Sequence, residues 1–310
     1  MKLFTFANNF TFFAMQEEKI IKNSWKAWLL AARPKTLTGA AVPVMIGLSL
    51  AWTKVDDFQW FPAILCLLFS FIMQIDANFV NDYFDFIKGN DDETRLGPKR
   101  ACAMGWVDAK VMRRAIIIVT VLACLIGLPL VFYGGLEMVL IGVLCVLFCF
   151  LYTTHLSYVG MGDVLVLVFF GIVPVCIPYY ILTHSINVEV VVASLACGLV
   201  IDTLLMINNY RDIENDQRAG KKTLAVKLGK ECSRMMYLLL GIMACLLGVV
   251  YMLNGHLWAF ILPVGYLALH VITYRHMVRI DHGRALNGVL GETARNMFVY
   301  GLLVSIGILI

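Results

Sequence analysis

Long runs of apolar residues without a charge recur along the whole 310-residue chain. Hydrophobic residues make up 60% of the sequence and charged residues only 15%, whereas a soluble domain carries roughly 45–50% and about 25%. Inside a bilayer no water satisfies the backbone, so runs of about 20 apolar residues favour helices that bond within themselves. The sequence therefore predicts an all-α polytopic membrane protein.

Nine such runs are candidate membrane spans. They lie near 37–53, 60–80, 115–133, 136–152, 162–182, 188–208, 235–253, 257–274 and 294–310. Six Lys and Arg precede residue 37, seven lie in 88–114, seven in 211–234 and four in 275–295, which leaves only Lys54 elsewhere. With nine spans these four segments share one side, and an excess of Lys and Arg marks the cytoplasmic side. The pattern predicts that the N-terminus and these four basic segments face the cytoplasm.

Two acidic clusters end the second and the sixth span and resemble each other. The first reads Asn81-Asp82-Tyr83-Phe84-Asp85 and the second Asn208-Asn209-Tyr210-Arg211-Asp212, and aligning Asn81 with Asn208 places Asp85 on Asp212. The similarity of the two clusters predicts one membrane domain over 1–310 with related halves at about 37–152 and 162–274. An N-terminal surface segment is predicted at 1–36. Both clusters fall on the predicted cytoplasmic side, as a shared site requires.

Carboxylates gathered at a membrane edge repel one another unless a cation neutralises them. Oxygen-rich clusters without histidine favour a hard cation such as Mg²⁺, which bridges carboxylates to the phosphates of a substrate. The candidate metal ligands are Asp82, Asp85, Asp91, Asp212 and Asp216. Basic residues of the two following loops are candidates for binding phosphate oxygens: Lys88, Arg95, Lys99, Arg100, Arg211, Arg218, Lys221 and Lys222. For any single one of these cations, an ordinary surface role is the simpler interpretation.

Other polar features are less informative. The nine Cys form no CxxC pair and the six His have no metal-ligand spacing, so neither a zinc site nor a disulfide framework is predicted. The net charge of +4 reflects membrane topology and does not indicate a nucleic-acid partner. Asp76 and Asp202 lie inside the second and sixth spans. They either help to orient the site or pair with polar groups between helices, and both interpretations stay open.

The two acidic clusters resemble the aspartate motifs of the UbiA superfamily of intramembrane aromatic prenyltransferases. The first motif extends from Asn81 to Asp91, and the second from Asn209 through Asp216 to Ala225. Three further segments are similar to the 1,4-dihydroxy-2-naphthoate polyprenyltransferases within that superfamily. They are Ala32-Arg33-Pro34-Lys35-Thr36-Leu37, Arg95-Leu96-Gly97-Pro98 with Arg100, and Gly160-Met161-Gly162-Asp163 with Phe169-Phe170-Gly171.

The resemblance implies a nine-helix transmembrane bundle around a central cavity, with two cytoplasmic cap loops. It implies that Mg²⁺ and a polyprenyl diphosphate are held by Asn81, Asp85, Asp91, Asn208, Asp212 and Asp216, with Asp82 and Asn209 beside them and Arg33 among the substrate contacts. Asp85 and Asp212 would serve catalysis at the diphosphate, and Asp163 and Tyr152 would act on the acceptor. The implied reaction joins the prenyl group to dihydroxynaphthoate with loss of CO₂ and gives a demethylmenaquinol. No obligate protein partner is implied.

One segment departs from the dihydroxynaphthoate pattern. Those enzymes usually carry a Lys- or Arg-containing insert after the tyrosine of the fourth span, but 152–159 contains neither residue. His155 or a basic residue elsewhere would then have to contact the carboxylate of the acceptor. Hydroxybenzoate enzymes typically have Lys four residues after that tyrosine, where this chain has Leu156.

Two alternatives to this function remain open. The first is a prenyltransferase for another acceptor, of the hydroxybenzoate or homogentisate class. The second, from a different class, is a divalent-cation transporter that uses the same carboxylates. A transport route needs polar groups that continue to the far leaflet, and the loops predicted on that side offer few of them.

Overall fold

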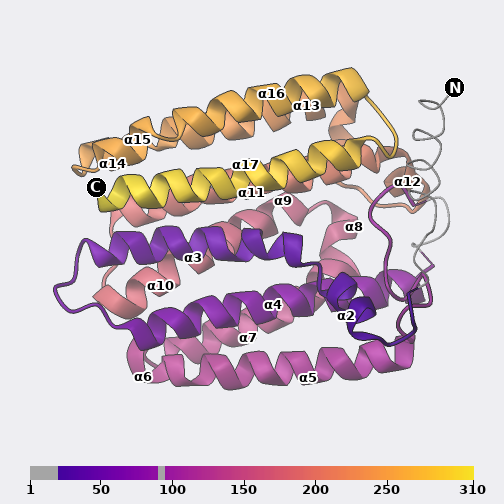
Figure 1. Ribbon diagram of the computed structural model, residues 1–310, viewed down its shortest axis with the longest axis horizontal. Helices are drawn as coiled ribbons and strands as arrows, with labels where there is room; N and C mark the ends of the chain where they lie inside the picture. Colours follow the sequence, from indigo (N-terminus) through magenta and orange to yellow (C-terminus); the bar gives the residue numbers. More distant parts are fainter. Residues whose placement is uncertain (1–19, 90–94) are drawn as a thin grey trace, which may run out of the picture.

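The computed structural model describes residues 20–89 and 95–310, and within these ranges the chain forms helices and no strands. The long helices run side by side along the longest axis of the molecule (Figure 1). The short helices α2 (Trp25–Ala32) and α12 (Ile213–Arg218) lie at one end, and α6 (Val131–Gly134) and the C-terminus lie at the other. The predicted all-α fold is confirmed.

The remaining helices follow the predicted apolar runs. They are α3 (Leu37–Trp52), α4 (Trp60–Ile87), α5 (Ala109–Gly127), α7 (Glu137–Leu151), α8 (Ser157–Val159), α9 (Gly162–Val166), α10 (Val173–Thr183), α11 (Val188–Arg211), α13 (Leu224–Leu247), α14 (Val249–Leu253), α15 (Leu257–Ile261), α16 (Val264–Ile280) and α17 (Leu286–Leu309). Two π-helical turns, Tyr152–Leu156 and Leu167–Ile172, interrupt the fourth and fifth runs.

Eight helical segments in the described ranges are long and apolar enough to cross a membrane. They contain the first eight predicted spans almost completely and extend several of them by one or more turns at the acidic end. The ninth prediction, 294–310, begins too late, because α17 starts at Leu286 and has 24 residues. Glu292 and Arg295 lie in the first half of α17, and this helix is not among the eight. A nine-span topology stays a prediction.

Helix α11 forms the centre of the bundle. It packs against α13, α17 and the π-helical turn Leu167–Ile172, and most of its residues are buried. Helix α17 lies between α3 and α16 (Figure 1) and packs against both of them. The last helix of the chain therefore closes the bundle against the first long helix.

Glycines allow several of these helices to approach closely. A Cβ added at Gly47 of α3 would lie 2.3 Å from the carbonyl oxygen of Val175 in α10. Real Cβ atoms do not come this close to another heavy atom. A Cβ at Gly171 would lie 2.7 Å from the carbonyl oxygen of Ser194 in α11. Small residues at helix contacts are a common means of association in membranes. Gly47 thus allows α3 to pack closely on α10, and Gly171 allows the π-helical turn to pack closely on α11.

We expect Gly47→Ala to destabilise the bundle by about 1–3 kcal/mol, because α3 must move away from the backbone of α10 to admit the methyl group. Thermal unfolding of the detergent-purified protein measures the effect. The matched control is Gly288→Ala in α17, where an added Cβ meets no atom within 4 Å. Because Ala favours a helix more than Gly does, the unfolding temperature of this variant should stay the same or rise. Equal unfolding midpoints for the two variants would contradict the close packing.

Candidate active site

A cavity of about 1590 Å³ opens among the helices. Its wall comes mainly from α3, α4, α7, α10, α11 and α17. One end is lined by Asn81, Asp85, Asn208, Asp212 and Asp216, and the wall continues past apolar side chains as far as Leu130, Met138 and Pro178. A charged end joined to a long apolar body suits an amphipathic ligand with a polar head and a hydrocarbon tail.

The structure brings the two acidic clusters to the same end of this cavity. Asn81 and Asp85 lie on the last turns of α4, where their spacing of four residues puts them on one face. Asn208 lies on the last turn of α11, and Asp212 is the junction between α11 and α12. Asp216 follows one turn later on α12, so both clusters point into the shared space.

Asp85 is paired with a buried arginine from the loop after α4. Arg100 Nη2 lies 2.9 Å from Asp85 Oδ2, and both side chains are more than nine-tenths buried. The loop that carries Arg100 is fixed by Asp82, whose Oδ2 and Oδ1 accept hydrogen bonds from the backbone N–H groups of Ala101 (2.8 Å) and Cys102 (2.9 Å). Asp82 is fully buried and does not line the cavity. This geometry does not support its predicted role as a metal ligand.

Arg211 organises the second cluster from behind. Its Nε and Nη2 donate to the two carboxylate oxygens of Asp212 at 2.9 and 2.6 Å, a bidentate geometry that fixes the carboxylate. Its Nη2 also donates to Asn208 Oδ1 at 2.6 Å, and its Nη1 donates to Asn287 Oδ1 of α17 at 2.8 Å. Asn287 in turn donates to the carbonyl of Leu96 at 2.8 Å. Arg211 is buried and does not line the cavity. It therefore positions the side chains of Asn208 and Asp212, and its predicted contact with phosphate is not supported.

Asp216 shows that negative charge accumulates at this end. Burial, and after it the nearby charges of Asp212 and Asp85, raise the pKa of its carboxyl to about 6, against the opposing effects of Lys221 and Arg211. Lys221 Nζ is 3.9 Å from Asp216 Oδ1. A buried carboxyl with negative charges close to it indicates a place where a bound cation lowers the free energy.

The remaining predicted contacts fall into three groups. The cavity is lined by Arg33, Arg95, Lys99, Asn209 and Arg218. Lys88 does not line it, because its Nζ donates to the carbonyl of Thr154 at 2.7 Å and lies over the Tyr158 ring, and Lys222 also lies outside the wall. Asp91 lies outside the described residues.

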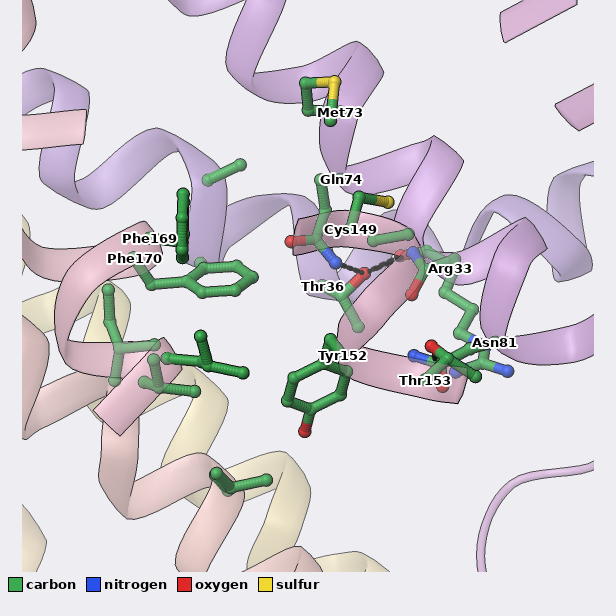
Figure 2. A pocket seen from close by; sticks show the side chains of 18 of the residues that line it. Arg33, Thr36, Met73, Gln74, Asn81, Cys149, Tyr152, Thr153, Phe169 and Phe170 are labelled. Atoms are coloured by element: carbon green, nitrogen blue, oxygen red, sulfur yellow. Dashed lines mark hydrogen bonds between the residues drawn. The ribbon is translucent and has the colours of Figure 1, made fainter. Parts of the chain in front are cut away.

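The acceptor-side prediction centres on the two π-helical turns. Tyr152 opens the first turn, and Phe169 and Phe170 lie in the second. Figure 2 shows the Tyr152 ring projecting into the open space between the two phenylalanines and the side that carries Asn81. Thr153, which follows Tyr152, donates through Oγ1 to Asn81 Oδ1 at 3.1 Å. Single π turns within α-helices are frequent at functional sites.

The intramembrane aspartates have different surroundings. Asp163 lines a small pocket that adjoins Tyr152 and Asn209, and its Oδ1 is buried without a hydrogen-bond partner. Asp202 lies on α11, which packs against α9, the helix that carries Asp163. Asp76 instead accepts a hydrogen bond of 2.7 Å from Thr120 of α5. Asp202 therefore lies beside the site, whereas Asp76 forms a polar pair between helices.

Two cavity residues, Gln74 and Arg295, were missed as site residues from the sequence. Thr36 Oγ1 accepts hydrogen bonds from Asn78 at 2.9 Å and from Gln74 at 3.4 Å, and Figure 2 shows Gln74 beside Thr36. The helical spacing of Gln74 from Asn78 and Asn81 could have indicated its position. Arg295 also lines the cavity from α17, although the sequence counted its charge with the cytoplasmic segment 275–295. His155 is exposed and bonds to Thr154, outside the cavity wall.

The residues at the charged end fit a hard divalent cation. The described part of the chain holds no preassembled group of three or more His, Cys, Asp or Glu that could ligate a metal. Mg²⁺ needs no such cage, because it keeps several waters and is usually held by one or two carboxylates together with phosphates of the substrate. Asp85 on one side and Asp212 and Asp216 on the other supply this donor set.

Comparison with known proteins gives a consistent result. The model of the UbiA prenyltransferase family matches residues 40–302. The chain is 33% identical to the 1,4-dihydroxy-2-naphthoate octaprenyltransferase of Haemophilus influenzae, with 96% of this chain and all of that protein covered. It is 35% identical to the enzyme of the same name from Escherichia coli, with 95% and 98% covered.

The fold is also shared with solved structures. A UbiA homolog from Aeropyrum pernix aligns with a TM-score of 0.66 at 14% identity, covering 87% of this chain and 96% of that one. A UbiA homolog from Archaeoglobus fulgidus, bound to DMAPP and Mg²⁺, aligns with a TM-score of 0.62 at 14% identity, covering 90% and 99%. At this level of identity the likeness establishes the architecture of the bundle.

Proposed function

The chain belongs to the UbiA prenyltransferase family, and from that premise we propose that it transfers a polyprenyl group from polyprenyl diphosphate to 1,4-dihydroxy-2-naphthoate. Diphosphate and CO₂ leave, and a demethylmenaquinol forms. The observation that carries the proposal is the pair of acidic clusters that face one apolar cavity from α4 and from α11–α12. The relatives named for this reaction support the choice of acceptor.

The charged end of the cavity binds the diphosphate. Asp85, Asp212 and Asp216 hold Mg²⁺ with help from Asn81 and Asn208. When bound, Mg²⁺ would supply positive charge that stabilises the departing diphosphate. Cavity-lining cations, namely Arg33, Arg95, Lys99 and Lys221, offer donors for the remaining oxygens. Arg100 and Arg211 keep the carboxylates oriented before the substrate arrives.

The middle of the cavity receives the reacting carbon atoms. The aromatic faces of Tyr152, Phe169 and Phe170 line this part, and such faces attract the positive charge that develops on the allylic carbon. Asp163 orients a ring hydroxyl of the acceptor. The ring carbon that bears the carboxylate bonds to the allylic carbon, the C–CO₂ bond breaks, and its electron pair restores the aromatic ring.

The eight apolar helices and the membership of the UbiA family indicate that the protein is an integral membrane protein. We place it in the bacterial inner membrane, with the charged end of the cavity at the cytoplasmic face, because 24 of its 25 Lys and Arg lie in the segments predicted for that side. The apolar body of the cavity then receives the prenyl tail from the bilayer.

Product analysis tests the proposal. Purified protein is incubated with Mg²⁺, a polyprenyl diphosphate and dihydroxynaphthoate, hydroxybenzoate or homogentisate, and the products are identified by mass. We expect a prenylated naphthoquinol that has lost the mass of CO₂, and no such product when EDTA is present. Transfer to hydroxybenzoate or homogentisate alone would reject the choice of acceptor, and metal movement across vesicles without prenyl transfer would favour a transporter.

A further inference from the structure

Arg295 occupies an unusual place for an arginine. Helix α17 begins at Leu286, so Arg295 lies nine residues into it, roughly 13 Å along the axis. It shares the cavity-lining face with Asn287, Gly291, Ala294 and Phe298, a spacing that follows one side of a helix. A charged side chain at membrane depth that lines a cavity is a functional-site hypothesis by default.

The charge of Arg295 has no carboxylate partner in the described part of the chain. Its Nε and Nη2 donate only to Asn296 Oδ1, at 3.4 and 3.2 Å. Glu292, one turn earlier on the same helix, is bonded to His276 of α16 at 2.9 Å. By contrast, the cavity-lining Arg100 and Lys221 are paired with Asp85 and Asp216. Arg295 therefore keeps its donor capacity for another group.

The wall around Arg295 leaves room for a ligand. A Cβ added at Gly291 would meet no atom within 4 Å, and the neighbouring Ala294 is small. Asn287, which reaches Arg211 at the acidic end, lies eight residues before Arg295, which is about 12 Å along the helix. Arg295 thus lies about two turns deeper than the predicted diphosphate site.

We propose that Arg295 binds the carboxylate of the aromatic acceptor, and this inference rests on the proposed function. An arginine guanidinium matches a carboxylate with two parallel hydrogen bonds. The segment 152–159 contains no Lys or Arg that could make this contact, and His155 lies outside the cavity wall. Arg295 selects acceptors that carry a carboxylate from α17, and it does not contribute to breaking the allylic C–O bond.

Steady-state kinetics of prenyl transfer test the inference with two acceptors, 1,4-dihydroxy-2-naphthoate and 1,4-dihydroxynaphthalene, which lacks the carboxylate. The variants are Arg295→Gln, Arg295→Lys and Arg275→Gln. Arg275 is an exposed arginine of α16 that does not line the cavity, so its loss controls for charge alone. Each variant is also checked for abundance and thermal unfolding, so that a folding defect is recognised.

We expect Arg295→Gln to raise the KM for the carboxylated acceptor by about 10- to 100-fold, the effect of losing a hydrogen-bonded charge pair. The KM for polyprenyl diphosphate and the kinetics with 1,4-dihydroxynaphthalene should change less than threefold, and Arg295→Lys should recover part of the loss. Arg275→Gln should match the parent protein.

Three outcomes would overturn the inference. One is an unchanged KM for the carboxylated acceptor in Arg295→Gln. Another is an equal loss with both acceptors, which indicates a general packing role. The third is a raised KM for polyprenyl diphosphate alone. A parent protein that prenylates neither acceptor would instead reject the proposed function, so the two failures are distinguishable.

Discussion

Asp85→Asn and Asp212→Asn are each expected to lower Mg²⁺-dependent prenyl transfer at least about a hundredfold, because each removes a carboxylate that would hold the Mg²⁺ needed to stabilise the departing diphosphate. The two carboxylates face the same end of the cavity from α4 and from the α11–α12 junction. The measurement is turnover in isolated membranes, normalised to the amount of folded protein. Both variants keep the size and shape of the side chain, so abundance should remain near normal.

A control on α4 tests whether the loss of any buried aspartate of this helix lowers activity. Asp76 is also a fully buried aspartate of α4, but its partner is Thr120. Asp76→Asn keeps a hydrogen-bonding group at that position and should retain most of the activity. Unchanged turnover in either Asp85→Asn or Asp212→Asn would reject the metal role of these residues.

Asp82→Ala is expected to inactivate the protein by a different route. The backbone N–H groups of Ala101 and Cys102 would lose their acceptor inside the protein, at about 1–3 kcal/mol for each group. The loop would then release Arg100 from Asp85. We expect prenyl transfer to fall about tenfold or more and limited proteolysis to cut within 95–108, while the Mg²⁺ concentration for half-maximal activity stays within twofold of the parent value.

The exposed Asp56 provides the matched control, since Asp56→Ala removes the same group from the surface. That variant should behave as the parent in both assays. If Asp82→Ala left the loop resistant to protease and raised the Mg²⁺ requirement more than tenfold, Asp82 would be a metal ligand as the sequence suggested.

Asp82 shows why the sequence could locate the site and yet not assign each residue. Asp82 and Asp85 are three residues apart, so helical spacing puts both on nearly the same face. Only the path of the following loop decides that Asp82 meets backbone N–H groups and that Asp85 meets the cavity. That path depends on contacts with distant segments, such as Asn287 with Leu96, which local pattern does not encode.

Arg295 illustrates a second limit. The apolar runs predicted eight spans well, because a bilayer requires long apolar helices whatever their partners are. Charged residues near the end of a run move the predicted boundary away from the helix end, so the predicted span began at 294, left out Glu292, and had Arg295 counted with the basic segment before it. The structure extends the helix through both of them to Leu286. Departures from the apolar pattern can thus mark the functional face of a span rather than its border.

The bonds from Arg211 to Asn287, and from Asn287 to the carbonyl of Leu96, have a consequence for biosynthesis. They join the second acidic cluster to the loop that follows α4 and to α17. A nascent chain that has released only its earlier spans cannot yet make them. Maturation of the catalytic end must therefore wait until α17 has been synthesised, and a product that stops before α17 would enter the membrane without a finished centre.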